Sequence, residues 1–520
     1  MKRNTLLYRE RRFFLIFIIC LFSITNIHEM KNSYATTLDM GNKQIYCKDN
    51  FFIKDYFKPT IVFWGTDDLD VGFDIAIDNE NNILITGVSL SDSYGIPLLK
   101  YSVTGELLWN ITFGKDGDFG FAVATDKAGF IYVSGKASYF TDSAFLCKFT
   151  PWGDLLWTYN ISGDYGYGIA LDFAFDSEGN IIVTGEYGIF NLYKQGFIHK
   201  VSSEGEQLWN FTWGGEYNDL FNGVVIDSND NIFVTGFIDD YTRDVLDVIL
   251  LKVSKEGQLL WNTTYDWGGY DEGLALTLDK QEDYIYIVGE TSSQSAGARD
   301  FLITKINCHT GKEVWFTSYG GVGWETAYNV VLDKDSNLLV AGRTGSVHIG
   351  NWDFFLGLFS SKTGELLFEY TWGGDHNDEC HSLAYLSEGS ITGVFMTGST
   401  RSFDSAAADL ALLIFMDSDG DFLTDAWEQD FGTDPLNTDT DFDGLNDYLE
   451  IDKYFTDPFD PDSDDDGWFD GKEVSWGTDP LNPTSNPQKR KLILSTTLPV
   501  SGLMIATATS IIVRRIKRIK

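Results

Sequence analysis

The sequence predicts an all-β protein assembled from copies of one unit, and two repeated phrases carry that prediction. The phrase G-E-L-L-W occurs six times with small changes, and its aromatic residue recurs at intervals of 48, 52, 52, 54 and 53 residues. A second phrase, an apolar run that ends in a small residue and glycine, occurs seven times, at Gly87, Gly135, Gly185, Gly236, Gly289, Gly342 and Gly398. A period of this length indicates a repeat architecture.

Each unit is expected to contain four short strands separated by turns. In the first unit the pattern predicts strands at 73–77, 83–86, 97–102 and 107–113, with turns at 78–82 and 104–105. Strands of this length between Gly, Asn and Asp turns, with no helical period, are typical of a four-stranded propeller blade.

The number of blades follows from the first and last segments. Six units have all four strands, but the seventh has three, at 382–386, 393–397 and 410–416. The segment 61–65 matches 210–214 and can supply the missing outer strand. We therefore predict a seven-bladed β-propeller over 59–416 closed by an N-terminal strand, because closure removes an exposed edge. An open solenoid of the same units is the alternative.

Two residue types recur at one place per unit. The aromatic residue of the first phrase, at Trp109, Trp157, Trp209, Trp261, Trp315 and Phe368, is expected to pack between adjacent blades, since a large ring fills the same gap each time. A lysine on the third strand, at Lys100, Lys148, Lys200, Lys252 and Lys305, is expected to form a structural ladder with neighbouring acids.

The motif D-x-x-G-N-I-x-V-T-G, present at 176–185, resembles that of secreted β-propeller repeats, and the likeness covers 59–416. The phrase T-G-E-L-L-W at 104–109 also looks like the tryptophan-docking motif of quinoprotein propellers. That second resemblance implies eight blades, a vicinal disulfide and a calcium-bound quinone. The chain has no adjacent cysteines, and this departure argues against a quinone cofactor.

Three twelve-residue windows rich in Asp begin after Met416. Each places oxygen ligands at positions 1, 3, 5, 9 and 12 and a backbone carbonyl at position 7, which is the spacing that wraps a loop around calcium. The first window supplies Asp417, Asp419, Asp421, Leu423, Asp425 and Glu428; the second Asp439, Asp441, Asp443, Leu445, Asp447 and Glu450; the third Asp462, Asp464, Asp466, Trp468, Asp470 and Glu473. Gly444 and Gly467 make the turn at position 6, where the first window has Phe422, so we expect the first site to be the weakest or distorted.

A solvated acidic linker is the alternative, and it fits poorly because fifteen carboxylates on one spacing would repel one another without a cation. The windows, over 417–487, resemble thrombospondin type 3-like repeats of microbial surface proteins. That resemblance implies that calcium supplies folding energy and gives a stiff stalk.

The two ends predict export and anchoring. Arg9, Arg11 and Arg12 precede an apolar run, and the order of features in 1–35 is that of a secretory signal, with an uncleaved anchor as the alternative. A linker would then occupy 36–58. At the other end, 492–513 is a run of 22 uncharged residues followed by a basic tail, so 488–520 is expected to be a transmembrane helix with a basic cytoplasmic tail. The alternative is sortase-like processing at 498–502. Both place the protein on the cell surface.

The charge of the chain limits the class of partner, and the number of cysteines limits the possible disulfides. Residues 13–488 hold 76 acidic and 25 basic residues, and such a surface repels phosphate backbones, so no nucleic-acid partner is expected. Outside the signal, Cys47, Cys147, Cys308 and Cys380 permit two disulfides with three pairings, or free buried thiols.

No catalytic residue is nominated from the sequence, because there is no H-x-x-x-H spacing, no G-x-S-x-G elbow and no phosphate-cradling loop. Four sequons, at Asn110, Asn160, Asn210 and Asn262, lie just after the repeated tryptophan and are candidate glycosylation sites. The leading hypothesis is a cell-surface adhesion protein, with surface glycans or proteins as partners of loops that follow the small-Gly phrase. The competing class is an extracellular enzyme: a glycosidase, a lyase or a quinoprotein.

Overall fold

The computed structural model describes residues 57–487 except 66–67, 91–93, 138–142, 162–166, 189–193, 216, 241–244, 296, 348–350, 390, 404–406 and 486. The predicted signal and C-terminal anchor, nearly all of the predicted linker and Cys47 lie outside these residues. Among the described residues, no helix has both the length and the apolar character needed to cross a bilayer.

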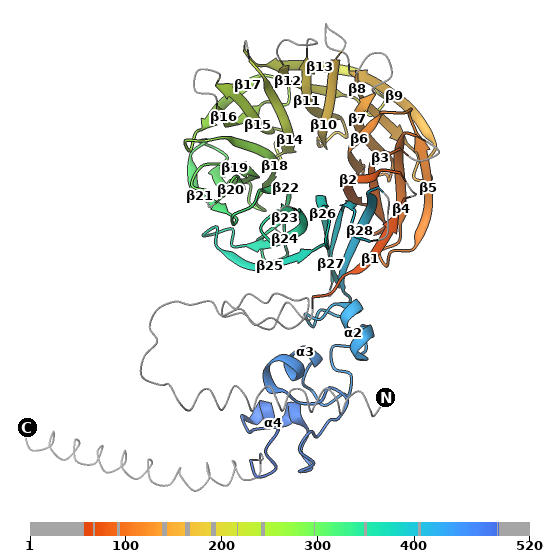
Figure 1. Ribbon diagram of the computed structural model, residues 1–520, viewed down its shortest axis with the longest axis vertical. Coiled ribbons are helices and arrows are strands. Elements are labelled where there is room, and N and C mark those ends of the chain that lie inside the picture. The colour runs from red at the N-terminus through yellow and green to blue at the C-terminus, as the bar shows by residue number, and fades with distance from the viewer. Residues whose placement is uncertain are drawn as a thin grey trace, which may run out of the picture. The chain divides into compact units, whose positions relative to one another are not determined.

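Seven four-stranded antiparallel sheets form a ring in the described part of the chain, as predicted (Figure 1). Each of the first six sheets takes four consecutive strands, in the order inner to outer. They are β2 (Asp70–Ile77), β3 (Ile83–Ser89), β4 (Ile96–Tyr101) and β5 (Leu107–Phe113); β6 (Phe119–Thr125), β7 (Ile131–Ala137), β8 (Ser143–Phe149) and β9 (Leu155–Ile161); and β10 (Tyr167–Phe175), β11 (Ile181–Gly188), β12 (Lys194–Val201) and β13 (Gln207–Trp213).

The next three sheets repeat the arrangement. They are β14 (Asp219–Ile226), β15 (Ile232–Asp240), β16 (Val245–Val253) and β17 (Leu259–Tyr265); β18 (Asp271–Leu278), β19 (Tyr284–Thr291), β20 (Asp300–Asn307) and β21 (Glu313–Tyr319); and β22 (Glu325–Leu332), β23 (Leu338–Thr344), β24 (Asp353–Phe359) and β25 (Leu366–Trp372). We call these six sheets blades 1 to 6.

Blade 7 joins the two ends of the propeller. Its inner strands are β26 (Asp378–Glu388), β27 (Ile391–Thr400) and β28 (Asp409–Asp417), and its outer strand is β1 (Thr60–Trp64). Val62 lies opposite Leu412 in this pairing, so the predicted closure by an N-terminal strand is confirmed. Leu412 is fully buried, and Val62 packs against the same apolar cluster.

The small-Gly phrase has a steric origin. Each of its seven glycines lies on the second strand of a blade, beside a bulge in the inner strand; Gly87, for example, pairs with Gly72 where the register shifts. A Cβ atom at Gly87 would overlap the carbonyl oxygen of Val71, and the other six glycines face the equivalent oxygen in the same way. Only glycine lets the two backbones approach this closely.

The repeated tryptophan bridges neighbouring blades, as predicted. Trp157 packs in an apolar cluster with residues of blade 3, and its indole N–H donates to the carbonyl of Ser203, 3.3 Å away. Trp209 donates in the same way to the carbonyl of Lys255 at 3.1 Å. At these two positions a large ring and one hydrogen bond therefore join successive units, whereas the buried indole nitrogen of Trp315 has no hydrogen-bond partner among the described residues.

The lysine ladder holds for three of five positions. Lys100, Lys200 and Lys252 pair with Asp78, Asp176 and Asp227 at 2.7, 2.7 and 3.6 Å. Lys148 and Lys305 instead lie over aromatic rings and donate to the carbonyls of Ser203 and Ser361. The expectation of acid partners is therefore wrong in blades 2 and 5. Ring contact does not by itself replace the acid, because Lys252 lies over the Phe233 ring and still pairs with Asp227.

The cysteines of the described residues are thiols. Cys147, Cys308 and Cys380 are buried and free, in blades 2, 5 and 7. Of the two alternatives left open by the sequence, the structure supports buried thiols for these three.

The acidic windows fold into short helical segments rather than simple loops. These are α2 (Asp425–Phe431), α3 (Asp447–Leu449), the π-helical turn η2 (Glu450–Tyr454) and α4 (Asp470–Trp476). The three α-helical segments begin at position 9 of their windows, and η2 begins at position 12 of the second. The all-β description therefore applies to the propeller and not to the repeats.

Candidate calcium sites in the acidic repeats

The backbone of each acidic loop organises its own carboxylates. At position 1, both oxygens accept backbone N–H groups from later in the loop; in the second window Asp439 accepts from Asp443 and Gly444 at 3.2 and 2.9 Å. The position 5 carboxylate accepts from the position 7 amide, as Asp443 does from Leu445 at 2.6 Å. These bonds bend the loop so that the other oxygens converge.

The carboxylates predicted at positions 1, 3 and 5 come together. In the first window Asp417, Asp419 and Asp421 each offer an oxygen within 4.8 Å of the others, and Asp439, Asp441 and Asp443 do the same in the second window. Carboxylate oxygens are the ligands that hard cations such as calcium prefer, and three of them this close can hold one.

The position 12 glutamates give the strongest indication that the repeats bind a cation. Glu428, Glu450 and Glu473 are completely buried, and each has at least one carboxylate oxygen that accepts no hydrogen bond from the described residues. Asp419, Asp441 and Asp464, at position 3, share this property for one oxygen each. Buried carboxylates are normally paired or bound to a metal, so these orphaned oxygens fit calcium.

The pKa values of these glutamates also favour a bound cation. Burial, together with the charges of Asp421 and Asp419, raises the pKa of Glu428 to about 9. Burial and the charges of Asp441 and Asp443 raise the pKa of Glu450 to about 9. Burial raises the pKa of Glu473 to about 7. A bound divalent cation would favour the ionised forms.

The first window accommodates Phe422 by adopting the glycine conformation. Phe422 has a φ of 81°, where Gly444 and Gly467 have 95° and 89°. The left-handed region is costly for a residue with a Cβ atom, by about 1–2 kcal/mol. The first loop therefore keeps the turn but carries local strain.

The position 9 aspartates connect one repeat to the next. Asp447 is held by Thr440, which donates to it from N–H and hydroxyl at 2.9 and 2.7 Å, while a carboxylate oxygen lies within 4.8 Å of Asp421 and Glu428 in the preceding repeat. Asp470 stands in the same relation to Asp443 and Glu450. Sequence reasoning placed these ligands in their own loops and missed the sharing, although a Ser or Thr at position 2 of every window was visible.

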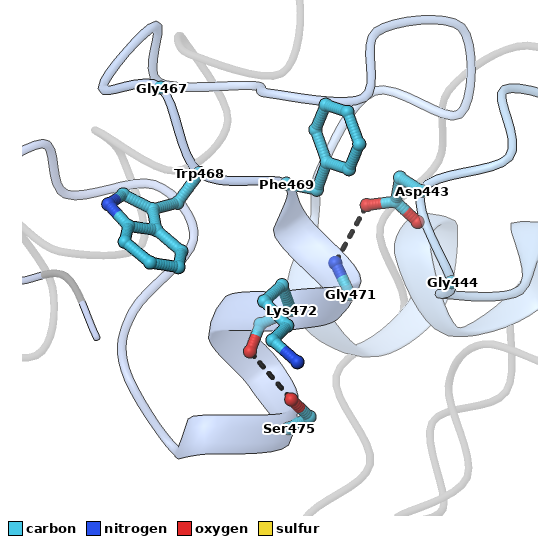
Figure 2. Close-up of a pocket in the computed structure, with 8 residues that line it drawn as sticks. All are labelled: Asp443, Gly444, Gly467, Trp468, Phe469, Gly471, Lys472 and Ser475. Carbon is cyan, nitrogen blue, oxygen red and sulfur yellow. Dashed lines mark hydrogen bonds between the residues drawn. The ribbon is translucent and has the colours of Figure 1, made fainter. Parts of the chain in front are cut away.

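Apolar and polar contacts also join the repeats. Leu423, at position 7 of the first window, is fully buried and packs with Ile451 of the second. Figure 2 shows the Asp443 carboxylate facing the start of α4, where Gly471 donates its backbone N–H at 2.7 Å. A cavity of about 480 Å³ beside this contact is lined by Asp443, Gly444, Gly467, Trp468, Phe469, Gly471, Lys472 and Ser475.

The sequons lie on outer strands β5, β9, β13 and β17. Asn110, Asn160, Asn210 and Asn262 are all exposed there. Their position leaves room for glycans, and their glycosylation stays a prediction.

The fold and these clusters define a seven-bladed β-propeller followed by three acidic repeats. Segments 417–438, 439–461 and 462–483 match the family model of the bacterial TSP3 repeat. No curated protein matches the sequence.

Two solved structures are similar to part of the chain. A periplasmic gluconolactonase of Pseudomonas aeruginosa is 10% identical with a TM-score of 0.44, covering 65% of this chain and 94% of that one. A protein from Lactobacillus plantarum is 14% identical with a TM-score of 0.42, covering 57% and 84%. Likenesses at this level carry no argument about activity.

Proposed function

We propose that the protein is a cell-surface binding protein that presents a propeller recognition face on calcium-stiffened repeats. The observation that carries the binding role is a cavity of about 380 Å³ in the propeller, lined by Thr212, Trp213, Gly214, Gly215, Tyr217, Asp219, Ile238 and Asp239. It lies where the chain passes from blade 3 into blade 4, beside the end of β15. Loops at such positions carry recognition because the blades hold them rigidly.

Backbone hydrogen bonds set the shape of this cavity, and side chains provide its contact groups. Asp219 begins β14, and its carboxylate accepts the N–H groups of Gly215 and Asp239 at 2.8 and 3.3 Å. These bonds set the shape of the cavity. Trp213, Tyr217 and the side chain of Asp239 then supply ring surface and polar groups in one small area.

This combination favours a carbohydrate ligand. The face of an aromatic ring is electron-rich and packs against the C–H groups of a sugar, while carboxylate and hydroxyl groups accept or donate hydrogen bonds to its hydroxyls. A concave site with aromatic walls and a few polar groups is the usual form of a small-molecule site. Surface glycans are therefore the partners we propose.

A glycan array probed with the full chain tests this role. Trp213→Ala should lower binding by about tenfold or more, as expected for loss of an aromatic anchor. Trp152→Ala is the matched control, because Trp152 is 73% exposed in the turn between β8 and β9, away from the cavity. Unchanged binding by Trp213→Ala would contradict the proposal. Glycan turnover that disappears with Asp239→Asn would instead favour the extracellular enzyme.

Calcium is the proposed cofactor of the repeats, supported by the buried glutamates with unbonded oxygens. Isothermal titration of the full chain with calcium should detect binding, and Glu450→Gln should weaken one site by about tenfold or more. Asp460→Asn removes an exposed acid from the same repeat and should leave affinity unchanged. Equal affinities of the two variants would contradict the assignment.

The proposed location on the cell surface, anchored through the C-terminus, is supported by the signal-like and apolar segments of the sequence. Protease treatment of intact cells should release propeller fragments. Fragments obtained only after lysis would count against it.

A further inference from the structure

The last strand of the propeller runs directly into the first acidic loop. Asp417 is the final residue of β28, where it pairs with Thr392 on β27, and it is also position 1 of the first window. Its carboxylate accepts the N–H groups of Gly420 and Phe422 at 2.7 and 3.3 Å. One residue therefore belongs both to the closing blade and to a candidate cation site.

The first repeat also contacts the residues just before β1, the strand that pairs with β28 in that blade. Lys58 lies two residues before β1, and its backbone N–H donates to the hydroxyl of Thr424 at 3.1 Å, while this hydroxyl donates to the Lys58 carbonyl at 2.8 Å. The Lys58 ammonium pairs with Asp430 on α2. The approach to β1 is thus bonded to residues on either side of the position 12 glutamate.

Aromatic contacts strengthen the same junction. Phe57 stacks on Phe415 of β28 at 4.4 Å and meets Phe368 and Tyr370 of blade 6 edge-on. The Lys334 ammonium, in the turn between β22 and β23, lies 5.7 Å from the centre of the Phe422 ring. Blade 6, β1 and β28 therefore converge on the first repeat.

We propose that calcium in the first acidic loop locks the closure of the propeller ring. Without a cation, the charges of Asp417, Asp419 and Asp421 repel one another at the end of β28, and Glu428 is buried beside them. With a cation, the loop and the start of α2 are drawn together, which holds Thr424 against Lys58. The closing pair β1–β28 then becomes the part of the propeller most sensitive to calcium, an inference that rests on the calcium binding proposed above.

Hydrogen–deuterium exchange of the full chain, with calcium and with EDTA, tests the lock. Amide protection of β1 and of the end of β28 should fall by about tenfold or more on chelation, because local opening of the closing pair becomes easier. Strands β10 to β13, in blade 3, are the internal control and should not change.

Variants can distinguish the effect of the cation site from the effect of the hydrogen bonds between Thr424 and Lys58. Asp419→Asn should reproduce the loss of protection at β1 and β28 even in calcium, whereas Asp464→Asn, at the same position of the third window, should leave both strands protected. Thr424→Val, which removes the hydroxyl bonded to Lys58, should expose β1 while the end of β28 stays protected.

The outcomes distinguish the two proposals. If the repeats gain protection with calcium but β1 and β28 do not, the lock is wrong and the calcium sites stand. If no peptide of the repeats responds to calcium, the calcium proposal and the lock fail together. Equal effects of Asp419→Asn and Asp464→Asn on β1 would also overturn the lock.

Discussion

Val62 of β1 lies directly opposite Leu412 of β28, although 349 residues separate them in the chain. The pair joins the first strand of the propeller to the last, so backbone pairing closes the ring. Closure of this kind covers the edge of β28 and couples the stability of the ring to a single short strand.

The first prediction concerns that strand. Val62→Asp places a carboxylate against the cluster that contains Leu412, and it should lower the free energy of unfolding by about 3 kcal/mol. Thr60→Asp, at an exposed position of the same strand, should change it by less than about 0.5 kcal/mol. Urea unfolding of the full chain measures both, and equal losses would mean that β1 contributes no specific packing.

The glycine of the second phrase should tolerate no side chain. Gly185→Ala would place a Cβ atom on the carbonyl oxygen of Ile169 and is expected to cost about 3 kcal/mol or more. Gly179→Ala meets no neighbouring atom but keeps a φ of 81°, so only the backbone cost of about 1 kcal/mol should appear. Melting curves would distinguish the two, and a reversed order would refute the steric explanation.

The contribution of the Trp157 hydrogen bond to stability should be measurable separately from the packing of its ring. Trp157→Phe keeps a ring in the gap but removes the donor to Ser203, so stability should fall by about 1–2 kcal/mol. Trp152→Phe, at a 73% exposed turn position, serves as the control and should be neutral. A neutral Trp157→Phe would show that the indole N–H adds nothing beyond packing.

Replacing one of the repeated third-strand lysines should lower the stability most where the substitution leaves a buried acid unpaired. Burial by itself would raise the pKa of Asp78, but bonds from Lys100 and the Asn82 and Glu80 amides hold it below its usual value. Lys100→Met should therefore destabilise the protein by about 3–5 kcal/mol. Lys305→Met should cost less, because that ammonium lies over the Tyr284 and Tyr286 rings and bonds a carbonyl. Chemical denaturation of both variants tests the order.

Asp172, a half-buried acid on the inner strand β10, should make the stability of the protein depend on pH. Burial, with a smaller contribution from Asp74, raises the pKa of Asp172 to about 7, although its carboxylate accepts the N–H groups of Val224 and Phe173. The folded state thus holds a proton that the unfolded chain releases above about pH 4. The contribution of Asp172 to stability is full below that pH and is lost as the pH rises through 7.

Asp172→Asn removes this titration. Compared with the wild type, the variant should become relatively more stable by about 2–3 kcal/mol between pH 5 and pH 8, as measured by urea unfolding at the two values. Asp116→Asn, at an exposed position, should show no such trend. A constant difference between Asp172→Asn and the wild type would place the pKa of Asp172 in its ordinary range.

Much of the propeller was predictable because each blade repeats a local pattern. The strand at 107–113 was placed at its observed bounds, while 73–77 and 83–86 extend to Asp70–Ile77 and Ile83–Ser89 in the structure. The extra residues lie at the strand ends near the inner bulge, and pairing with neighbouring strands, not local propensity, orders them. The alternating pattern could not reveal where that pairing stops.

The acidic repeats were also predictable only in part. Spacing alone identified the residues of each window, and the structure brings positions 1, 3 and 5 together in the first two windows. Spacing could not show that Asp447 approaches Asp421 and Glu428, because that contact depends on how one repeat packs on the next through Leu423 and Ile451.

By itself the sequence determined the repeat, the number of blades and the residues with calcium spacing, since these depend on order along the chain. Only the tertiary structure decided which of the repeated lysines pair with acids, where a cavity forms between blades 3 and 4, and how Thr424 reaches Lys58. These contacts join residues that are distant in sequence, and their geometry depends on the packing of whole sheets rather than on any local pattern.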